Sequence, residues 1–385
     1  MNRKHVFFWK LLVPLVRLFL RFRFGYTCKQ VKNVPGPYIV LSNHVTDWDP
    51  LFVGSSFRDQ MYFVASEHIA RWKFAYKLIQ YAFAPIMRYK GTVAASTVVE
   101  VLRKIKAGNN VCIFAEGVRT WDGITGPVLP STGKLVKSAK CGLVTYKITG
   151  GYFISPNWTE GDLRRGPVSG APVHVYSKEE IAAMSVDEIN RIIETDLYEN
   201  AYERQLANPA VYRCKALSRG FENLMFLCPS CGEADTIVSQ ENLVRCTACG
   251  HSFRYNEKGM LEGTKFVTVR EVFRWQKRRV RSMVEEGKSV SSPNGRLLTV
   301  ENHVEAQVSE GSVSISAEGL RCGDTLIPLE SISDLAMHGR HALVFESGRT
   351  YYELLPDRGS NALKYQLFFR AWQKVRKESR IPSVT

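Results

Sequence analysis

The 385-residue sequence contains no run of 18 or more uncharged apolar residues, which argues against a helix that crosses a membrane. It also lacks the composition of a disordered or fibrous protein, because 45% of its residues are hydrophobic and 23% are charged, close to the globular average. We find no internal repeat. A chain of this length is expected to form two or three domains.

Acidic residues are scarce, and the first of them is Asp47. The formal net charge is +15, which favours an anionic partner such as nucleic acid, a membrane surface or an acidic substrate. The segment before Asp47 is both basic and strongly apolar. Lys10, Pro14, Arg17 and Arg21 are spaced to form one narrow stripe on a helix, with apolar residues around it.

For residues 1–33 we therefore predict a basic amphipathic helix that lies in a membrane interface. A cleaved signal peptide is disfavoured, because Lys10 and Arg17 interrupt the apolar segment and no small-residue cleavage site follows. The alternative is a helix that packs on the domain after it.

Strand and helix patterns alternate through residues 34–220. Short apolar segments predict strands, and amphipathic segments predict helices near 50–57, 67–82, 94–107, 132–140 and 185–206, the last with a capping box of Ser185 and Glu188. This alternation predicts an α/β domain with a largely parallel sheet flanked by helices.

The nine cysteines are an odd number, and four of them form two Cys-x-x-Cys pairs. This usage argues against a secreted disulfide scaffold and for a reducing compartment with a metal site. Fourteen residues separate the pairs, which are Cys228, Cys231, Cys246 and Cys249. Four thiolates at this spacing can close a tetrahedral zinc site with no open position, so we predict structural zinc. The segment, which we place at 221–262, resembles a zinc ribbon; two independent redox pairs are the alternative.

Residues 263–385 begin with a basic helix or linker and continue with short strands and turns before a final helix near 361–377. This pattern predicts a small β-barrel capped by one helix. In strand number and final helix it resembles the pleckstrin-homology-like barrels, which often serve as docking modules.

His44 follows an apolar strand, at the sheet edge where open α/β folds place their chemistry. A nearby carboxylate could hold the imidazole tautomer and raise its basicity. Asp47 would share the face of His44 on a helix, whereas Asp49 precedes Pro50 and is pushed out of the helical region. The spacing leaves both aspartates open. Asp49 could also be an ordinary N-cap, and His44 an ordinary loop histidine.

A second polar loop follows the strand that ends near Phe114. Glu116 and Arg119 lie on it around Gly117, and an arginine there suits a phosphate group. A surface ion pair between Glu116 and Arg119 is the alternative. For Arg88, farther up the chain, a solvated surface charge is the simpler interpretation.

Together these loops resemble the motifs of the lysophospholipid acyltransferase family. Its Asn-His-x-x-x-x-Asp motif is matched by Asn43, His44 and Asp49. Its Phe-Pro-Glu-Gly-x-Arg-Ser motif is matched by Phe114, Glu116, Gly117 and Arg119, with Ala115 in place of proline and Thr120 in place of serine. The arginine of a further motif looks like Arg88, and the family's fourth motif lacks its usual proline here.

The resemblance implies that His44 is the general base and that Asp49 orients it. Glu116, beside Gly117, would position the glycerol part of the acceptor, and Arg119 with Arg88 would bind its phosphate. No protein nucleophile is required.

The implied reaction moves an acyl group from acyl-CoA or acyl carrier protein to a lysophospholipid, converting 1-acylglycerol-3-phosphate to phosphatidic acid. We expect peripheral or monotopic attachment at the cytoplasmic face of the cell membrane, with membrane lipids as partners, structural zinc and no organic cofactor. A nucleic-acid-binding zinc-ribbon protein and a non-catalytic membrane scaffold are the alternatives. We expect no nucleic-acid partner, because the segment 226–258 is slightly acidic.

Overall fold

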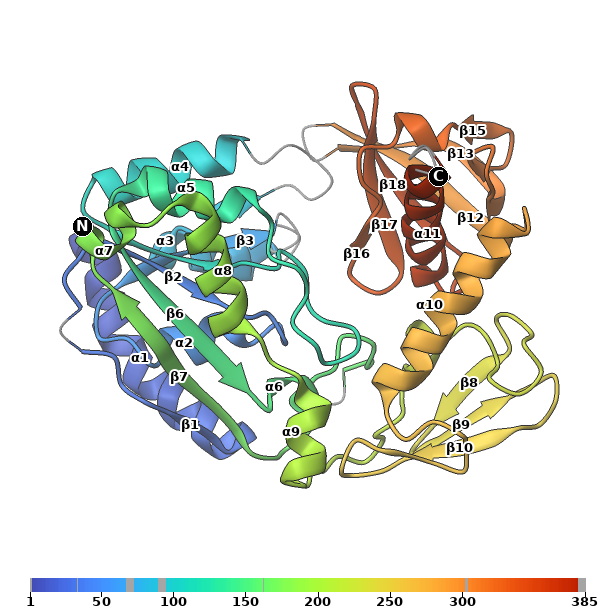
Figure 1. Ribbon diagram of the computed structural model, residues 1–385, viewed down its shortest axis with the longest axis horizontal. Coiled ribbons are helices and arrows are strands. Elements are labelled where there is room, and N and C mark those ends of the chain that lie inside the picture. Colours follow the sequence, from blue (N-terminus) through green and yellow to red (C-terminus); the bar gives the residue numbers. More distant parts are fainter. Residues whose placement is uncertain are drawn as a thin grey trace, which may run out of the picture.

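The computed structural model describes residues 2–32, 34–66, 73–88, 95–161, 163–301 and 304–379. Its first part is an α/β domain around a seven-stranded sheet (Figure 1). The strands are β1 (Tyr26–Cys28), β2 (Tyr38–Ser42), β3 (Met61–Ser66), β4 (Ile86–Arg88), β5 (Asn110–Phe114), β6 (Gly142–Thr149) and β7 (Val168–Tyr176). Their order is β1-β7-β6-β2-β5-β3-β4, and every neighbouring pair is parallel except β6 with β7. The predicted α/β fold with a largely parallel sheet is confirmed.

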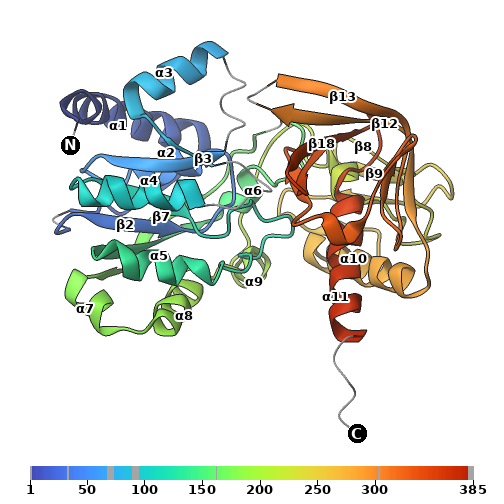
Figure 2. The same ribbon diagram turned by 90° about the horizontal axis from the view of Figure 1, so that it is seen from above.

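Helices cover both faces of this sheet (Figure 2). One face carries α1 (Arg3–Phe24), α2 (Asp49–Gly54) and α3 (Lys73–Phe83). The other carries α4 (Ala95–Lys106), α5 (Ser131–Ala139), α7 (Lys178–Ala183) and α8 (Val186–Leu197). The period of two along β2 explains both layers: Val40 packs in one core with Trp9 and Phe52, while Ile39 and Leu41 pack in the other.

The predicted helix 185–206 is two helices. The capping box of Ser185 and Glu188 starts α8, as predicted. The chain then leaves the helical conformation at Tyr198, and α9 (Ala201–Ala207) begins after Asn200, whose side chain accepts a hydrogen bond from the Glu203 N–H. The predicted single helix is therefore divided, because Asn200 is the N-cap of a second helix. Of the predicted helix 67–82, residues 67–72 lie outside the described residues.

The N-terminal helix α1 packs on the domain with one side. Trp9, Leu20 and Phe24 are buried, and the Trp9 indole donates to the carbonyl of Phe57 at 3.3 Å. Arg17 also turns inward, because its Nε and Nη2 donate to the Ser55 carbonyl at 3.0 and 2.6 Å. The predicted basic stripe is thus interrupted at Arg17. Within the described segments, no helix combines the length and the apolar character needed to span a bilayer.

Two antiparallel sheets follow the α/β domain. The smaller sheet has the order β11-β10-β9-β8, formed by β8 (Ile237–Gln240), β9 (Leu243–Cys246), β10 (Ser252–Tyr255) and β11 (Leu261–Glu262). The larger sheet has the order β15-β14-β13-β12-β18-β17-β16, formed by β12 (Val290–Glu301), β13 (Val304–Ile315), β14 (Leu320–Cys322), β15 (Thr325–Ile327), β16 (Ala336–His338), β17 (Ala342–Ser347) and β18 (Thr350–Pro356). The final helix α11 (Leu363–Ser379) packs against β12, β13 and β16.

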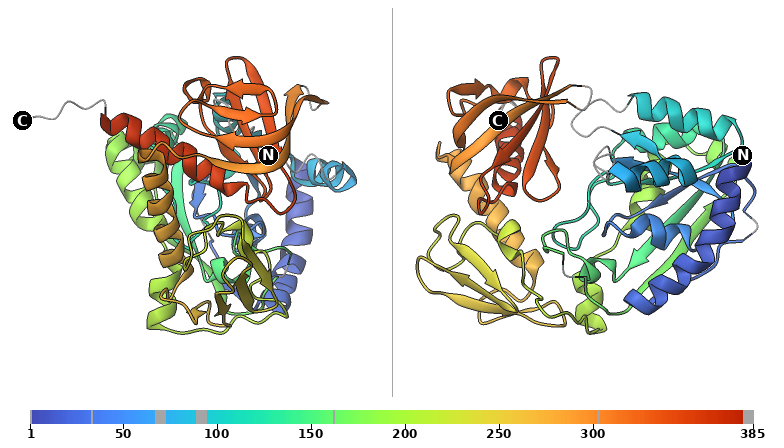
Figure 3. Two further views of the ribbon diagram at one scale, coloured as in Figure 1. Left: turned by 90° about the vertical axis from the view of Figure 1, so that its right-hand side faces the viewer. Right: turned by 180° about the vertical axis from the view of Figure 1, so that it is seen from behind.

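The long helix α10 (Val269–Glu285) joins the two antiparallel sheets and packs along α11 (Figure 3). A capping box of Thr268 and Glu271 starts α10, and Arg281 forms an ion pair with Glu378 of α11 at 2.6 Å. The basic helix predicted near 264–284 is therefore a structural connection between the two sheets.

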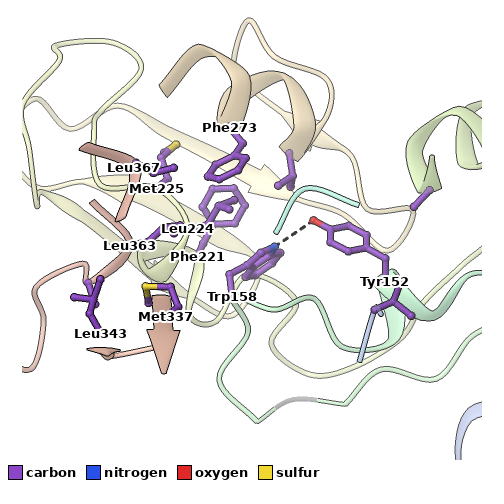
Figure 4. Close-up of a cluster of buried hydrophobic side chains, with 14 of the residues drawn as sticks. Tyr152, Trp158, Phe221, Leu224, Met225, Phe273, Met337, Leu343, Leu363 and Leu367 are labelled. Carbon is purple, nitrogen blue, oxygen red and sulfur yellow. Dashed lines mark hydrogen bonds between the residues drawn. The ribbon is translucent and has the colours of Figure 1, made fainter. Parts of the chain in front are cut away.

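One hydrophobic core joins all three regions of the chain (Figure 4). Trp158 of the α/β domain packs against Phe221, with ring centroids 5.0 Å apart, and against Tyr255 of β10 at 5.4 Å. Met337 and Leu363 of the C-terminal region belong to the same buried cluster. The C-terminal region is therefore fixed against the α/β domain by buried contacts.

Candidate active site

The two polar loops singled out in the sequence meet at the carboxyl ends of inner strands in the sheet of the α/β domain. β2 and β5 are parallel neighbours, with Ser42 opposite Phe114 at their carboxyl ends. The loops that follow are hydrogen-bonded to each other, because the Thr120 N–H donates to the His44 carbonyl at 3.2 Å. Arg88 ends β4, whose partner β3 lies beside β5 on the same sheet. All the predicted site residues of the α/β domain therefore lie at the carboxyl ends of strands.

Asp49 is the carboxylate that holds His44. Nδ1 of His44 lies 2.7 Å from Oδ2 of Asp49, and Asp49 is fully buried. The carboxylate also accepts the Val45 N–H at 2.6 Å, the Thr46 N–H at 3.0 Å and the Thr46 hydroxyl at 2.7 Å. Three donors besides the imidazole stabilise an ionised Asp49, so Nδ1 must donate and Nε2 is left as the acceptor.

Asp47 has a different position. It is two-thirds exposed, and its Oδ1 lies 3.3 Å from Nε of Arg119. The His44 ring stacks on Phe114, with centroids 4.6 Å apart, and is 21% exposed. The structure thus resolves the choice that spacing left open: Asp49 contacts the imidazole, and Asp47 pairs with the arginine.

Asn43 supports the same loop in a way that the sequence did not predict. Its side chain donates to the Ile148 carbonyl at 2.9 Å and accepts the Ile148 N–H at 2.8 Å. The amide thus replaces a backbone partner for β6 and ties the start of the His44 loop to that strand. The signal available in the sequence was the asparagine directly before the histidine.

Glu116 is buried and faces backbone groups. Its carboxylate accepts the His44 N–H at 2.7 Å and the Gly126 N–H at 2.5 Å. Burial raises the pKa of Glu116 to about 8, and these two N–H groups oppose the shift. In this arrangement Glu116 links the His44 loop to the loop around Gly126. Its predicted contact with the glycerol of an acceptor stays a prediction.

Arg88 and Arg119 lie around Gly117. This glycine has a φ of +68°, and a Cβ there would stand 2.9 Å from Nη1 of Arg88. The positive φ favours glycine, and a side chain there would also push the Arg88 guanidinium aside. Nε of Arg88 and Nη1 of Arg119 are buried, and neither has a hydrogen-bond partner among the residues that the structure describes. Buried guanidinium donors without partners are well suited to an anionic group.

The four predicted metal ligands come together at the tip of the smaller sheet. Their sulfur atoms all lie within 4.8 Å of one another. Cys228 Sγ is 3.7 Å from Cys249 Sγ, and Cys231 Sγ is 3.8 Å from Cys246 Sγ. Sulfur atoms bound at about 2.3 Å to a tetrahedral zinc ion stand about 3.8 Å apart, so the four thiols fit that ion.

A family model matches part of the α/β domain. Residues 25–149 match the family model named Acyltransferase. A search of curated proteins found no match. Among solved structures, the chain is similar to the crystal structure of the 1-acyl-sn-glycerophosphate (LPA) acyltransferase PlsC from Thermotoga maritima, with 17% identity and a TM-score of 0.43 over 52% of this chain and 80% of that one. The chain therefore contains an acyltransferase domain, and the four-cysteine cluster and both antiparallel sheets lie outside the matched segment.

Proposed function

We propose that the protein is a membrane-attached acyltransferase that moves an acyl group from a thioester to the free hydroxyl of a lysophospholipid. The proposed acceptor is 1-acylglycerol-3-phosphate, and the product is phosphatidic acid. The observation that carries the proposal is the 2.7 Å contact between His44 and buried Asp49, next to loops whose arginine donors have no partner among the described residues. The match to the acyltransferase family over the same residues supports it.

The geometry of His44 is suited to general-base catalysis. Nε2 accepts the proton of the acceptor hydroxyl while the hydroxyl oxygen attacks the thioester carbonyl carbon. Asp49 stabilises the imidazolium that forms. When the tetrahedral intermediate collapses, the carbon–sulfur bond breaks and the leaving thiolate takes the proton from His44. A thioester of coenzyme A or of acyl carrier protein would supply the same sulfur leaving group.

Arg119 and Arg88 are the proposed phosphate ligands. Arginine holds its charge at neutral pH and offers donors in a planar fork that fits phosphate oxygens. Arg119 is 10% exposed, and its Nε already faces Asp47. Its Nη1 has no partner in the part of the chain that the structure describes, so it is the donor that we assign to the acceptor phosphate.

The exposed side of α1 is the proposed membrane contact. Phe7, Leu11, Leu15, Leu18 and Phe22 form an apolar stripe on that side, with 61, 51, 59, 53 and 67% of each residue exposed. Helix α3 lies against α1 and adds Leu78 and Tyr81, which are also more than half exposed. Apolar surface of this extent is typical of an interface with lipid or protein. We place it on the cytoplasmic face of the cell membrane.

The four-cysteine cluster would hold a structural zinc ion through Cys228, Cys231, Cys246 and Cys249. A closed four-thiolate site stabilises the fold around it. For the C-terminal sheet and α11 we keep the pleckstrin-homology-like resemblance as a proposal.

The decisive experiment is an acyl-transfer assay of the purified full-length protein. Acyl-CoA and acyl carrier protein thioesters serve as donors, and lysophosphatidate, other lysophospholipids and monoacylglycerol serve as acceptors. We expect transfer to lysophosphatidate and its loss in His44→Ala. Absence of transfer to every acceptor would refute the enzyme. Binding of nucleic acid instead would support the zinc-ribbon alternative, and binding of vesicles alone would support the scaffold alternative.

A further inference from the structure

The turn between β16 and β17 reaches from the C-terminal sheet to the α/β domain. It consists of Gly339, Arg340 and His341. Nε of Arg340 donates to the carbonyl of Asn157 at 2.8 Å, and Nε2 of His341 lies 3.3 Å from a carboxylate oxygen of Glu160. Asn157 follows the short helix α6 (Gly151–Ile154), which comes directly after β6. The turn is therefore held at the same end of the sheet as the His44 loop.

The charged groups around Arg340 include Arg119 and Asp47 of the predicted phosphate site. Burial lowers the pKa of Arg340, the positive charge of Arg119 lowers it further, and Asp47 and Glu160 oppose the shift. Arginine nevertheless stays protonated at neutral pH. Arg119 and Arg340 are 221 positions apart in the chain, yet both have the exposed Asp47 among their charged neighbours.

The hydrogen bonds of these arginines are incomplete. Arg340 uses only Nε, toward Asn157, among its contacts with described residues. Arg119 uses Nε toward Asp47, whereas its buried Nη1 and the buried Nε of Arg88 have no partner in the described part of the chain. Like charges gathered in a partly buried site raise the free energy of the folded protein unless anions lie between them. Asp47 and Glu160 supply part of this compensation, and the donors without partners in the described residues could take a further anion.

We infer that Arg340 is a third phosphate-binding residue of the acceptor site, contributed by the C-terminal sheet to the site that Arg88 and Arg119 begin. The inference rests on the proposed function and extends it. It also assigns a role to the C-terminal region, which is to make the enzyme selective for acceptors that carry a phosphate. A phosphate bound by three arginines would satisfy the donors for which the described residues offer no partner.

The test compares Arg340→Gln with Arg349→Gln in the full-length protein. Arg349 lies in the exposed turn between β17 and β18 of the same sheet and serves as the matched control. We expect Arg340→Gln to raise the KM for lysophosphatidate about tenfold or more, since charge-assisted bonds to phosphate are among the strong ones. The kcat, and the rate with monoacylglycerol where the wild type uses it, should stay within about twofold, because neither depends on the phosphate. A KM equal to that of Arg349→Gln would overturn the assignment.

A structural role for Arg340 would give a different result. Loss of the Asn157 contact alone would disturb the packing of the turn and lower kcat with every acceptor, which would also overturn the assignment. If Arg340→Gln does not fold, Arg340→Lys keeps the charge but loses the planar fork. That variant should still bind dodecyl phosphate more weakly than Arg349→Gln does, and equal binding would refute the inference.

Calorimetric titration with dodecyl phosphate separates the inference from the proposed function. Weaker binding of dodecyl phosphate by Arg340→Gln than by the wild type would support the arginine site even in a protein without measurable transfer. Transfer to lysophosphatidate by the wild type with equal dodecyl phosphate binding in both proteins would refute the arginine site and leave the proposed enzyme standing.

Discussion

The His44–Asp49 pair and the arginine group lie on adjacent loops but are built in opposite ways. His44 and Asp49 are five positions apart, and the carboxylate is fully buried with every contact supplied by its own loop. The arginines come from distant parts of the chain, and Arg88 and Arg119 keep buried donors without partners in the described residues. A group whose bonds are complete is preorganised for chemistry, whereas a group with open donors is prepared for a ligand.

The largest effect is expected from loss of the proposed zinc ion. It should disturb the arginine group, to which the C-terminal sheet contributes Arg340, more than the His44–Asp49 pair. Gln276 of α10 accepts the backbone N–H groups of Phe226 and Leu227 next to Cys228, and buried Lys364 of α11 forms an ion pair with Asp235. The four-cysteine cluster is therefore tied to both helices that hold the C-terminal sheet. Structural zinc binds peptides with about 10–16 kcal/mol, so Cys231→Ser should release one zinc per chain and loosen this region.

The readouts are zinc content, thermal unfolding and the KM for lysophosphatidate, with Cys214→Ser as the control outside the cluster. We expect a raised KM with some transfer remaining, because His44 and Asp49 lie in a separate domain. Protein purified without chelators that contains no zinc would contradict the metal assignment.

The next largest effect concerns His44 and Asp49, the proposed catalytic pair. Asp49→Asn removes the acceptor for Nδ1 and leaves a buried amide opposite N–H donors, so we expect a fall in kcat of about 10² to 10⁴, the range typical of a general base. Asp47→Asn, at an exposed position on the same loop, should change kcat little. Initial rates at saturating lysophosphatidate measure both, and a greater loss in Asp47→Asn would reverse the assigned roles.

A smaller effect is expected from a substitution in the arginine group. Arg119→Ala removes a charge-assisted contact of about 1.5–3 kcal/mol, so the KM for lysophosphatidate should rise while the rate with a phosphate-free acceptor is unchanged. Titration with both acceptors provides the measurement. Equal losses with the two acceptors would show that Arg119 supports the loop through Asp47 and does not bind phosphate.

Substitutions in the apolar stripe on α1 should weaken binding to vesicles by a similar or smaller free energy. Leu11→Glu and Leu15→Glu each remove burial of roughly 1 kcal/mol in a lipid interface. Val238→Glu changes an exposed apolar residue of β8 and serves as the control. Flotation with anionic vesicles should show reduced binding for the two α1 variants only. Unchanged flotation in all three variants would place the membrane contact elsewhere.

The last effect is on stability and not on activity, and it concerns Glu116. Burial raises its pKa to about 8, whereas an unfolded glutamate titrates near 4.3. Between these values the folded protein keeps a proton that the unfolded chain has lost, so stability falls as pH rises through this window and the loss is complete above about pH 8.

Glu116→Gln cannot titrate and should remove this part of the pH dependence, which is at most about 1.4 kcal/mol per pH unit. Urea unfolding between pH 5 and 8.5 measures it, with exposed Glu318→Gln as the control. Parallel curves for the wild type and Glu116→Gln would show that Glu116 is ionised throughout.

Local patterns in the sequence were sufficient for the features that are local in the chain. The two Cys-x-x-Cys pairs and the capping box at Ser185 depend on residues a few positions apart, so their spacing carries the geometry. The alternation of strands and helices predicted the α/β sheet, since periodicity reports which side of each element is buried.

Tertiary structure decided the rest. Spacing could not choose between Asp47 and Asp49, and only the folded loop shows which carboxylate meets the imidazole. The inward turn of Arg17 depends on the carbonyl of Ser55, which the periodicity of α1 does not report. The contact between Asn157 and Arg340 spans 183 positions. No local pattern reports such a pair, because its geometry is set by the core that packs the C-terminal sheet against the α/β domain.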